Sequence, residues 1–412
     1  MKEKKGYAWI IFIVAILMKI GGGATYATTS NFVAPVVNEF GCQVNQFTLI
    51  TSIQAIGMAL FYTTAAKILT TKRIGIVMGI GCLVEVIGVG LMGTYRNVQS
   101  FYISAAMIGI SQAFTGFVAV PILLNMWFKK NYGTIFGIVM GVSSASTVLF
   151  SLLSGVLITD FGWRTAYFVL AGIAFVVMVP AVFLFVKSPE EKGELPYGAD
   201  EQEHVAVNTD EWGLTKSEAF TKFAFWAAWI TCLCYSIGSC ANGYVVPFTT
   251  MELGQSVNYG ARVGMFSSIG GILCSFILGR INDKFGPKAG LLWGAVMSVV
   301  GFGTIIMSIG NTDLVMIGAF ILGLGSSMYT VQCPILAKNV IGDRHFSSVW
   351  SIMMTANSLI GGGLYSSFAL FYDLGGTYRG AFITGAILYV LGLVFGVLSI
   401  NSSKSYKPEK VK

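Results

Sequence analysis

The chain has 412 residues, of which 55% are hydrophobic and only 11% are charged. A water-soluble protein of this length needs more charge to cover its surface, so the composition excludes an ordinary soluble enzyme and indicates a protein solvated by lipid. The 50 glycines and only 9 prolines favour close helix packing in a membrane over a loop-rich fold.

Apolar stretches of about 20 residues, the length that a helix needs to cross a hydrocarbon core of ~30 Å, recur along the chain. The first begins near Tyr7 and lacks a signal-peptide cleavage pattern, so we expect it to be retained as a helix. We predict spans near residues 8–33, 46–67, 74–94, 98–125, 132–158, 165–187, 220–248, 258–280, 288–309, 313–338, 346–371 and 378–400. The predicted fold class is an all-α membrane protein with twelve transmembrane helices in two pseudo-symmetric six-helix bundles.

One long polar stretch interrupts this pattern. Residues 188–219 are acidic and carry no pattern that would form a core, which is typical of a linker. The predicted domains are an N-terminal bundle (1–187), a central cytoplasmic linker (188–219) and a C-terminal bundle with a short cytoplasmic tail (220–412).

The basic residues predict the orientation. Of the 26 Lys and Arg, 21 fall in loops on the side of the termini, four fall in loops on the other side, and Lys19 lies within a helix. Because Lys and Arg are retained on the cytoplasmic face, we expect both termini in the cytoplasm and the protein in the plasma or inner membrane. The net charge of +7 then reflects topology and lipid headgroups, and requires no nucleic-acid partner.

One constant shift along the chain, which we call the repeat offset, superimposes several uncommon features. It brings Pro121-Ile122-Leu123 onto Pro334-Ile335-Leu336, Asp160 and Gly162 onto Asp373 and Gly375, and Lys67-Ile68 onto Arg280-Ile281. The same shift in three separate regions indicates duplication of a six-helix unit, and such repeats are typical of transporters that work by alternating access.

The segment from Gly279 to Lys288 (GRINDKFGPK) resembles the loop signature of the major facilitator superfamily, and the resemblance extends along essentially the whole chain. It implies a conformational latch at the cytoplasmic ends of two helices. The latch residues would be Gly279, Arg280, Asp283, Lys284 and Gly286. The first copy of the signature, from Ala66, has Thr70 in place of the acidic residue.

The segment Trp127-Phe128-Lys129-Lys130-Asn131-Tyr132-Gly133, followed by Gly137 and Gly141, is similar to a hinge motif of the oxalate/formate antiporter and monocarboxylate porter branches. That similarity implies a carrier of small organic anions. Those branches often use an arginine about eight residues before the loop aspartate, where this chain has Ser275, and a lysine near the outer end of the first helix, where it has Ser30 or nearby polar residues.

Two ionisable side chains lie deep within predicted spans. Lys19 and Glu85 each lie roughly 17 Å into a helix at 1.5 Å per residue. An intramembrane charge costs several kcal/mol unless it is paired or hydrated, which makes both residues functional candidates. Two interpretations stay open: Lys19 is the counter-charge of an anionic substrate while Glu85 exchanges a proton, or the two form a permanent ion pair that fixes packing.

Other polar residues on the expected cavity helices are candidates for hydrogen bonds to a small solute, or for interhelical packing. The predicted substrate-binding residues are Lys19, Tyr26, Asn31, Gln54, Gln112, Asn242, Tyr244, Tyr329, Gln332 and Asn357. The sequence offers no nucleophile–base pair and no metal-ligand cluster, so we expect no catalytic residues, no metal and no cofactor.

The sequence therefore predicts a secondary active transporter that moves a monocarboxylate or dicarboxylate by alternating access, by proton symport or anion exchange. We expect a monomer whose partners are a small-molecule solute, membrane lipids and protons. The rival prediction is a multidrug or amphipathic-compound exporter of the same fold, and transport of labelled carboxylates against drug-resistance profiling separates the two. A membrane-embedded enzyme is a third and weaker alternative.

Overall fold

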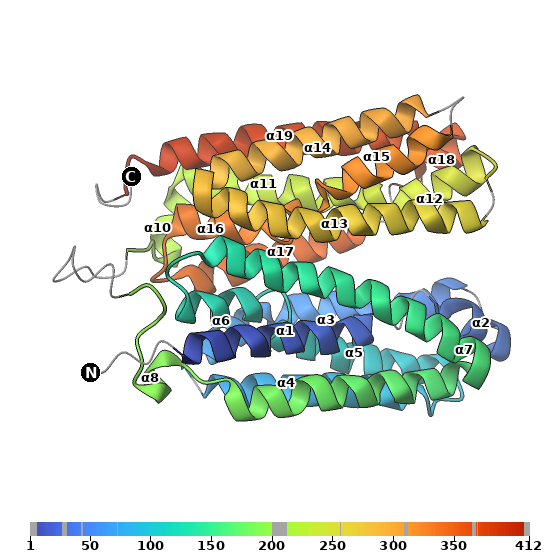
Figure 1. Ribbon diagram of the computed structural model, residues 1–412, viewed down its shortest axis with the longest axis horizontal. Helices are drawn as coiled ribbons and strands as arrows, with labels where there is room; N and C mark the ends of the chain where they lie inside the picture. The colour runs from blue at the N-terminus through green and yellow to red at the C-terminus, as the bar shows by residue number, and fades with distance from the viewer. Residues whose placement is uncertain are drawn as a thin grey trace. The chain divides into compact units, whose positions relative to one another are not determined.

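The computed structural model describes residues 6–26, 31–42, 44–71, 73–199, 212–255, 257–308, 312–364, 368 and 370–407. The chain divides into two compact units, and helices dominate both (Figure 1). Unit 1 comprises Met1–Tyr132, Val142–Asn208 and Met354–Leu359. Unit 2 comprises Gly133–Gly141, Thr209–Met353 and Ile360–Lys412.

Long apolar helices account for the predicted spans. In the described part of the chain, ten helical segments are long and apolar enough to cross a membrane. One of them, α7 (Tyr132–Phe185), has 54 residues and is kinked at Gly162, whose φ of 80° and ψ of 158° suit only glycine. The kink separates the fifth and sixth predicted spans, and α17 (Phe346–Leu364) lies in the eleventh. The predicted fold class is confirmed.

Unit 1 contains six shorter elements besides most of α7. These are α1 (Tyr7–Tyr26), α2 (Val33–Phe40), α3 (Val44–Thr71), α4 (Ile74–Met92), α5 (Val98–Thr115) and α6 (Ala119–Trp127), and α8 (Pro189–Lys192) follows α7. Within this unit α5 packs against both α3 and α4, and α1 contacts α4 and α6. Residues from α1, α4 and α5 can therefore meet in its interior.

Unit 2 repeats this order of helices. It contains α10 (Lys216–Thr221), α11 (Phe223–Cys240), η1 (Ala241–Tyr244), α12 (Val245–Pro247), η2 (Phe248–Glu252), α13 (Val257–Phe285), α14 (Pro287–Met307), α15 (Asp313–Gly323), η3 (Ser326–Met328), α16 (Gln332–Ile341), α17, α18 (Leu370–Gly375) and α19 (Arg379–Ser403). The first residues of three helix pairs, α3 and α13, α4 and α14, and α6 and α16, are related by the repeat offset. The shift found in the motifs thus also relates the helices.

Two predicted spans are interrupted, which the hydropathy pattern does not indicate. The span near 98–125 is divided between α5 and α6 at Gly116, whose φ of −98° and ψ of −131° are not helical. The span near 313–338 is divided between α15 and α16 around the short helix η3. Pro121 and Pro334 lie in the first turn after each break, where a missing N–H is tolerated. Broken helices expose backbone polar groups, and transporters use them to line binding sites.

Glycines let helices cross closely at equivalent places in the two units. A Cβ on Gly109 of α5 would collide with the backbone of Gln54 on α3, and one on Gly323 of α15 would collide with the backbone of Ser267 on α13. The repeat offset brings Gln54 onto Ser267. Close backbone contact of this kind replaces the hydrophobic driving force that is absent between helices in lipid.

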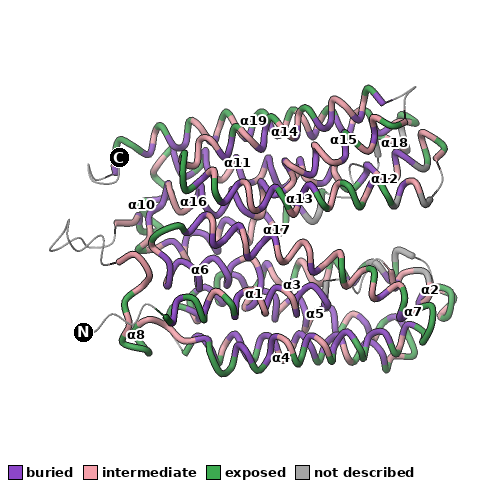
Figure 2. The backbone as a smooth tube through the Cα atoms, in the orientation of Figure 1, coloured by how far each residue is buried: buried purple, intermediate pink, exposed green. Residues whose placement is uncertain are grey.

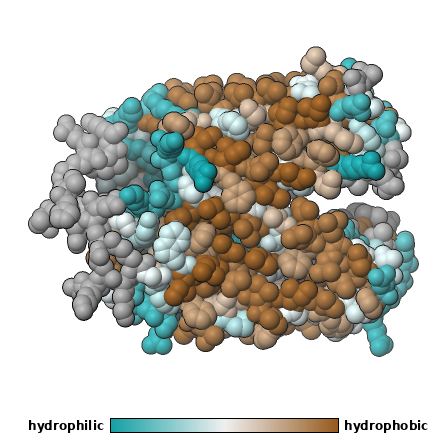
Figure 3. Space-filling model, viewed as in Figure 1, coloured by the Kyte–Doolittle hydropathy of each residue, from teal (hydrophilic) through white to brown (hydrophobic). Residues whose placement is uncertain are grey.

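Each long helix has a buried and an exposed side (Figure 2). The exposed sides carry large apolar residues such as Leu152 at 67%, Val176 at 71% and Met307 at 75% exposure. On the face shown in Figure 3, apolar side chains cover the sides of the helices and hydrophilic ones gather near the helix ends. Such surfaces are unfavourable in water but match a bilayer core.

The described residues at the start of the predicted linker are hydrogen-bonded to unit 1, and those at its end are hydrogen-bonded to unit 2. In unit 1, Tyr197 donates its backbone N–H to Trp127 O at 2.8 Å and accepts from Lys129 N at 3.0 Å. In unit 2, Leu214 N donates to Ile341 O at 2.8 Å, and Trp212 O accepts from Asp343 N at 2.9 Å. The loops that follow α6 and α16 therefore both hold a linker end by backbone hydrogen bonds.

Candidate functional site

A small cavity inside unit 1 brings the two intramembrane charges together. Its volume is about 10 Å³, close to what one water molecule needs. The cavity is lined by Met18, Lys19, Gly22, Cys82, Glu85, Thr115, Gly116 and Met178. Helices α1, α4 and α7 and the α5–α6 break each contribute to this lining.

Small residues on α4 explain how Glu85 reaches this cavity. Gly81 and Gly88 lie one turn before and nearly one turn after Glu85, on the same face of the helix. A Cβ on Gly81 would lie 3.1 Å from Thr115 Cγ2, and one on Gly88 would lie 2.9 Å from Ile108 Cγ1. Because these glycines have no side chain, α5 packs directly on the face of α4 that carries the carboxyl group.

The Glu85 carboxyl group is hydrogen-bonded on both oxygens. It is 2% exposed, with Oε1 at 2.6 Å from Thr25 Oγ1 and Oε2 at 3.0 Å from Thr115 Oγ1. The side chain of Gln112 also hydrogen-bonds to it. Three partners from α1 and α5 therefore compensate for the loss of water around this buried acid.

Lys19 faces the same cavity with far fewer contacts. Its side chain is 6% exposed, and its Nζ lies 6.0 Å from the centre of the Phe117 ring. Glu85 is close enough for its charge to act on Lys19. Within the described part of the chain, however, the ammonium group forms no hydrogen bond or ion pair with a carboxylate. A buried charge without a direct partner is costly inside a membrane, which makes Lys19 a candidate for function.

The other predicted substrate-binding residues lie at several places. Gln112 reaches Glu85, whereas Asn31 donates to Ser151 O at 2.7 Å and to Ser154 Oγ at 2.8 Å on α7. Gln332 is fully buried and exchanges hydrogen bonds with Asn282 at 2.7 and 3.1 Å. Gln54, Asn242 and Tyr329 are half-buried, Tyr244 packs against the ring of Tyr378, and Asn357 is buried. The side chain of Tyr26, like residue Ser30, lies outside the described part.

Asp283, the central residue of the predicted latch, lies near the end of α13, and its side chain contacts the start of α7. Its carboxylate accepts hydrogen bonds from Gly133 N at 2.9 Å and Thr134 N at 2.5 Å, both within unit 2. Asn131 occupies the N-cap position of α7 but makes no capping bond with its side chain. The aspartate of a distant helix thus supplies the acceptor that the helix end lacks, with a favourable charge. Gly133 and Gly137 pack directly on α13 and make this approach possible.

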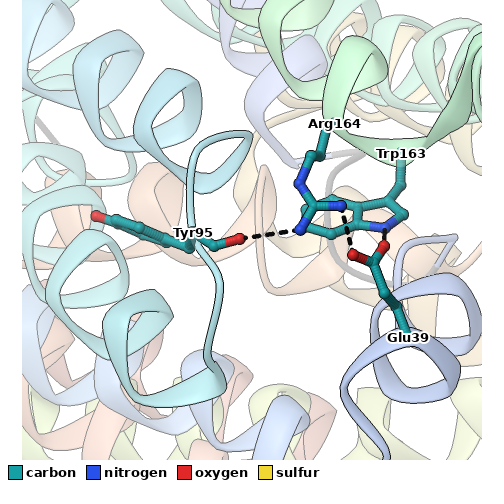
Figure 4. Close-up of polar contacts among 4 residues, drawn as sticks. All are labelled: Glu39, Tyr95, Trp163 and Arg164. Atoms are coloured by element: carbon teal, nitrogen blue, oxygen red, sulfur yellow. Dashed lines mark hydrogen bonds and ion pairs between the residues drawn. The ribbon is translucent and has the colours of Figure 1, made fainter.

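An acidic residue near the end of α2 in unit 1 was not predicted from the sequence. Glu39, near the end of α2, accepts hydrogen bonds from Trp163 Nε1 at 2.6 Å and from Arg164 at 2.5 Å (Figure 4). Arg164 also donates to Tyr95 O at 3.2 Å and stacks on the Trp163 ring at 4.2 Å. Hydrogen bonds from Arg164 and then Trp163 lower the pKa of Glu39.

A similar arrangement recurs at the equivalent place in unit 2. The repeat offset brings Glu39 onto Glu252, which accepts from Thr377 Oγ1 at 2.7 Å and from Tyr378 N at 2.8 Å. Gly41 and Gly254, each two residues after its glutamate, have φ values of 61° and 63°. The shared pattern Glu-x-Gly at the repeat offset is the signal that could have found both residues.

An all-α protein with span-length apolar helices and a charged pocket inside one helical unit is a multispanning membrane protein. The chain belongs to the Major Facilitator Superfamily, whose profile matches residues 8–273 and 234–412. Members of this superfamily are transporters, so the coarse prediction of a membrane transport protein is confirmed.

Relatives and solved structures agree with this assignment. Multidrug resistance protein MdtG of Klebsiella pneumoniae (strain 342) is 23% identical over 345 residues, 78% of this chain and 76% of that protein. Multidrug resistance protein MdtH of Citrobacter koseri is 31% identical over 120 residues, only 28% of either chain.

Two solved structures have the same fold. The proton:xylose symporter XylE has a TM-score of 0.74 at 12% identity, covering 98% of this chain and 97% of its own. The human organic anion transporter MFSD10 has a TM-score of 0.71 at 12% identity, covering 96% and 100%. At such identities the likeness shows the fold alone.

Proposed function

We propose that this protein is a secondary active transporter that moves a small organic anion together with a proton. The observation that carries this proposal is the Lys19 ammonium, buried beside Glu85 in a cavity lined by α1 and α4. A fixed cation inside a membrane protein selects an anionic solute, and a neighbouring carboxyl group can take up and release a proton.

Charge balance links the two ligands. With Glu85 ionised, the pocket contains one positive and one negative group and attracts an anion weakly. With Glu85 protonated, Lys19 is the uncompensated charge, and in a low-dielectric interior its attraction for a carboxylate is strong. Anion and proton therefore bind best together, which is the requirement for symport.

The cavity as it stands is too small for a carboxylate. Two methionines, Met18 and Met178, form part of its wall. Methionine side chains are unbranched and adapt to irregular shapes, so their rearrangement offers a way to admit a solute. We assign the anion to Lys19 and the proton to Glu85, and treat Gln112 as a neighbour that holds Glu85 in place.

Three further observations support the wider arrangement that the sequence predicts. The 21-to-4 distribution of basic residues supports cytoplasmic termini in a plasma or inner membrane. The helix pairs whose first residues are related by the repeat offset support two duplicated six-helix halves. The two bonds from Asp283 to the start of α7 support a latch that must open and re-form during transport.

A second candidate function is export of amphipathic compounds. It is favoured by the multidrug resistance proteins among the relatives, and by Ser275 at the position where similar anion carriers have an arginine. This alternative makes the Lys19 and Glu85 pocket a site for proton exchange only.

Transport by purified protein in liposomes tests the proposal. With an inward proton gradient, labelled formate, oxalate or lactate should accumulate above its level without a gradient, and a protonophore should abolish the difference. Cys232→Ala, at the position equivalent to Lys19 in unit 2, is the matched control and should transport normally. Carboxylates that do not accumulate, with extrusion of an amphipathic dye instead, would favour the second candidate.

A further inference from the structure

Thr25 makes more close contacts through its hydroxyl group than one hydrogen can serve. The residue is 4% exposed and is the second-to-last residue of α1. Its Oγ1 lies 2.8 Å from the carbonyl oxygen of Gly22 and 2.6 Å from Glu85 Oε1. A hydroxyl group has one hydrogen to donate and two lone pairs to accept with. Thr25 can therefore donate a full two-centre bond to only one of these two oxygens, and otherwise shares its hydrogen between them in a weaker three-centre bond.

A proton on Glu85 satisfies both contacts. In that state Glu85 Oε1–H donates to Thr25 Oγ1, and Thr25 donates its own hydrogen to Gly22 O. The distance of 2.6 Å lies within the range of an O–H···O hydrogen bond and is compatible with a bond in either direction. When Glu85 loses its proton to water, the Thr25 hydroxyl turns and donates to the carboxylate, and the bond to Gly22 O is given up.

We infer that Thr25 is a positioning residue whose hydroxyl reverses its hydrogen bond when Glu85 gains or loses a proton. This inference rests on the proposed role of Glu85 as the proton-binding group. It adds a link to α1, because the bond that is made or broken belongs to the last turn of that helix. Lys19 is on the same helix, so the proposed proton and anion sites share one element.

The groups around Glu85 leave few other partners for its proton. In the described part of the chain, two titratable side chains face Glu85: Lys19 from α1 and Cys82 from α4. Helix α5 contributes Gln112 and Thr115, and α7 contributes Met178. Thr115 Oγ1 lies 3.0 Å from Glu85 Oε2 and 3.2 Å from Ser111 O. It can donate to the second oxygen of Glu85 in either protonation state, at the expense of the longer contact with Ser111 O.

The test compares Thr25→Val, which removes the hydroxyl, with Thr25→Ser, which keeps it. Infrared difference spectra of the protein in liposomes, recorded during a pH titration, should show a carboxylic acid C=O band that is absent in Glu85→Gln. In Thr25→Val this band should move to higher frequency, because the protonated carboxyl group loses its acceptor. The pH of half-protonation should rise by about one unit, because the ionised carboxylate loses a stronger, charge-assisted hydrogen bond than the protonated form does. Thr25→Ser should restore both.

The outcomes separate this inference from the proposed function. A Glu85 band that Thr25→Val leaves unchanged in frequency and in pH dependence would overturn the inference, whatever the protein transports. A band that responds to Thr25, in a protein that accumulates no carboxylate, would support the inference and contradict the assignment of an organic anion. If the Thr25→Val variant does not fold, Thr25→Ala replaces it in the test. The same spectral changes are expected for Thr25→Ala.

Discussion

The position of Lys19 and Glu85 in unit 1 contrasts with the equivalent position in unit 2. At the repeat offset, Lys19 corresponds to Cys232 and Glu85 to Ser298, so unit 2 has no charge there. Gly22, which lines the cavity in unit 1, corresponds to Tyr235. The Tyr235 ring is fully buried and packs against Tyr389 at 5.4 Å between ring centres.

The two arrangements are alternative solutions for the inside of one helical unit. In unit 2 the rings of two tyrosines fill the space, which stabilises packing without any buried charge. In unit 1 a glycine leaves the space open, and the two charges around it reduce stability. Only one copy of the duplicated unit keeps the buried charges and the loss of stability that they cause. This difference points to a function located in unit 1.

The largest expected effect comes from removing the cation. Lys19→Met should weaken carboxylate binding by about 3 kcal/mol, roughly 100-fold, because the anion loses the charge that compensates for its desolvation. Binding is measured by calorimetry on purified protein at a fixed acidic pH. Cys232→Ala is the control and should change binding little, although it can lower the melting temperature slightly. Equal losses in both variants would contradict the contrast between the units.

A smaller and more selective effect is expected from Glu85→Gln. The amide keeps the size and most hydrogen bonds of the carboxyl group but cannot release a proton. Accumulation driven by a proton gradient should fall roughly tenfold, whereas exchange of internal for external anion should stay within about threefold. Ser298→Ala, at the equivalent position in unit 2, should leave both activities unchanged. If gradient-driven accumulation survives in Glu85→Gln, the proton binds elsewhere.

The two copies of the loop signature should contribute differently to the stability of the protein. Asp283→Ala should destabilise the protein by about 1 to 2 kcal/mol, because the first turn of α7 loses the acceptor of two backbone N–H groups. Among the described residues, Thr70, at the equivalent position, bonds only to backbone within its own helix, so Thr70→Ala should cost less than about 0.5 kcal/mol. Thermal unfolding in detergent measures both. Asp283→Asn keeps an acceptor and should lie between them.

Much of the fold could be predicted from the sequence because lipid demands long apolar helices. The same reasoning placed Lys19 and Glu85 at matching depth, since charges are rare in such segments. It could not find Thr25 or Thr115, because a hydroxyl inside an apolar helix bonds equally well to its own backbone. The breaks at Gly116 and near Gly325 were missed for a related reason: hydropathy averages over a window and does not register backbone angles.

The smallest effect is expected from replacing Glu39 in unit 1 or Glu252, its equivalent in unit 2. Glu39 pairs with the charged Arg164, while Glu252 bonds to the uncharged hydroxyl of Thr377 and the backbone of Tyr378. Since both Glu39 and Arg164 are about 40% exposed, Glu39→Gln should cost less than about 1 kcal/mol. Salt should reduce that cost, because about 1 M salt shortens the screening distance to ~3 Å, and should hardly change the cost of Glu252→Gln.

The pH dependence of Glu39→Gln follows from the lowered pKa of Glu39. Its ion pair stabilises the protein at any pH above the ordinary range of a glutamate, and this contribution disappears as the pH falls through the lowered pKa. The melting temperatures of wild type and Glu39→Gln should therefore differ at neutral pH and low salt, and converge in acid or in high salt. A difference that persists in both conditions would mean that Glu39 acts through packing against Trp163, as an uncharged side chain would. The two glutamates would then be equivalent in mechanism as well as in position, and the charge on Arg164 would need another explanation.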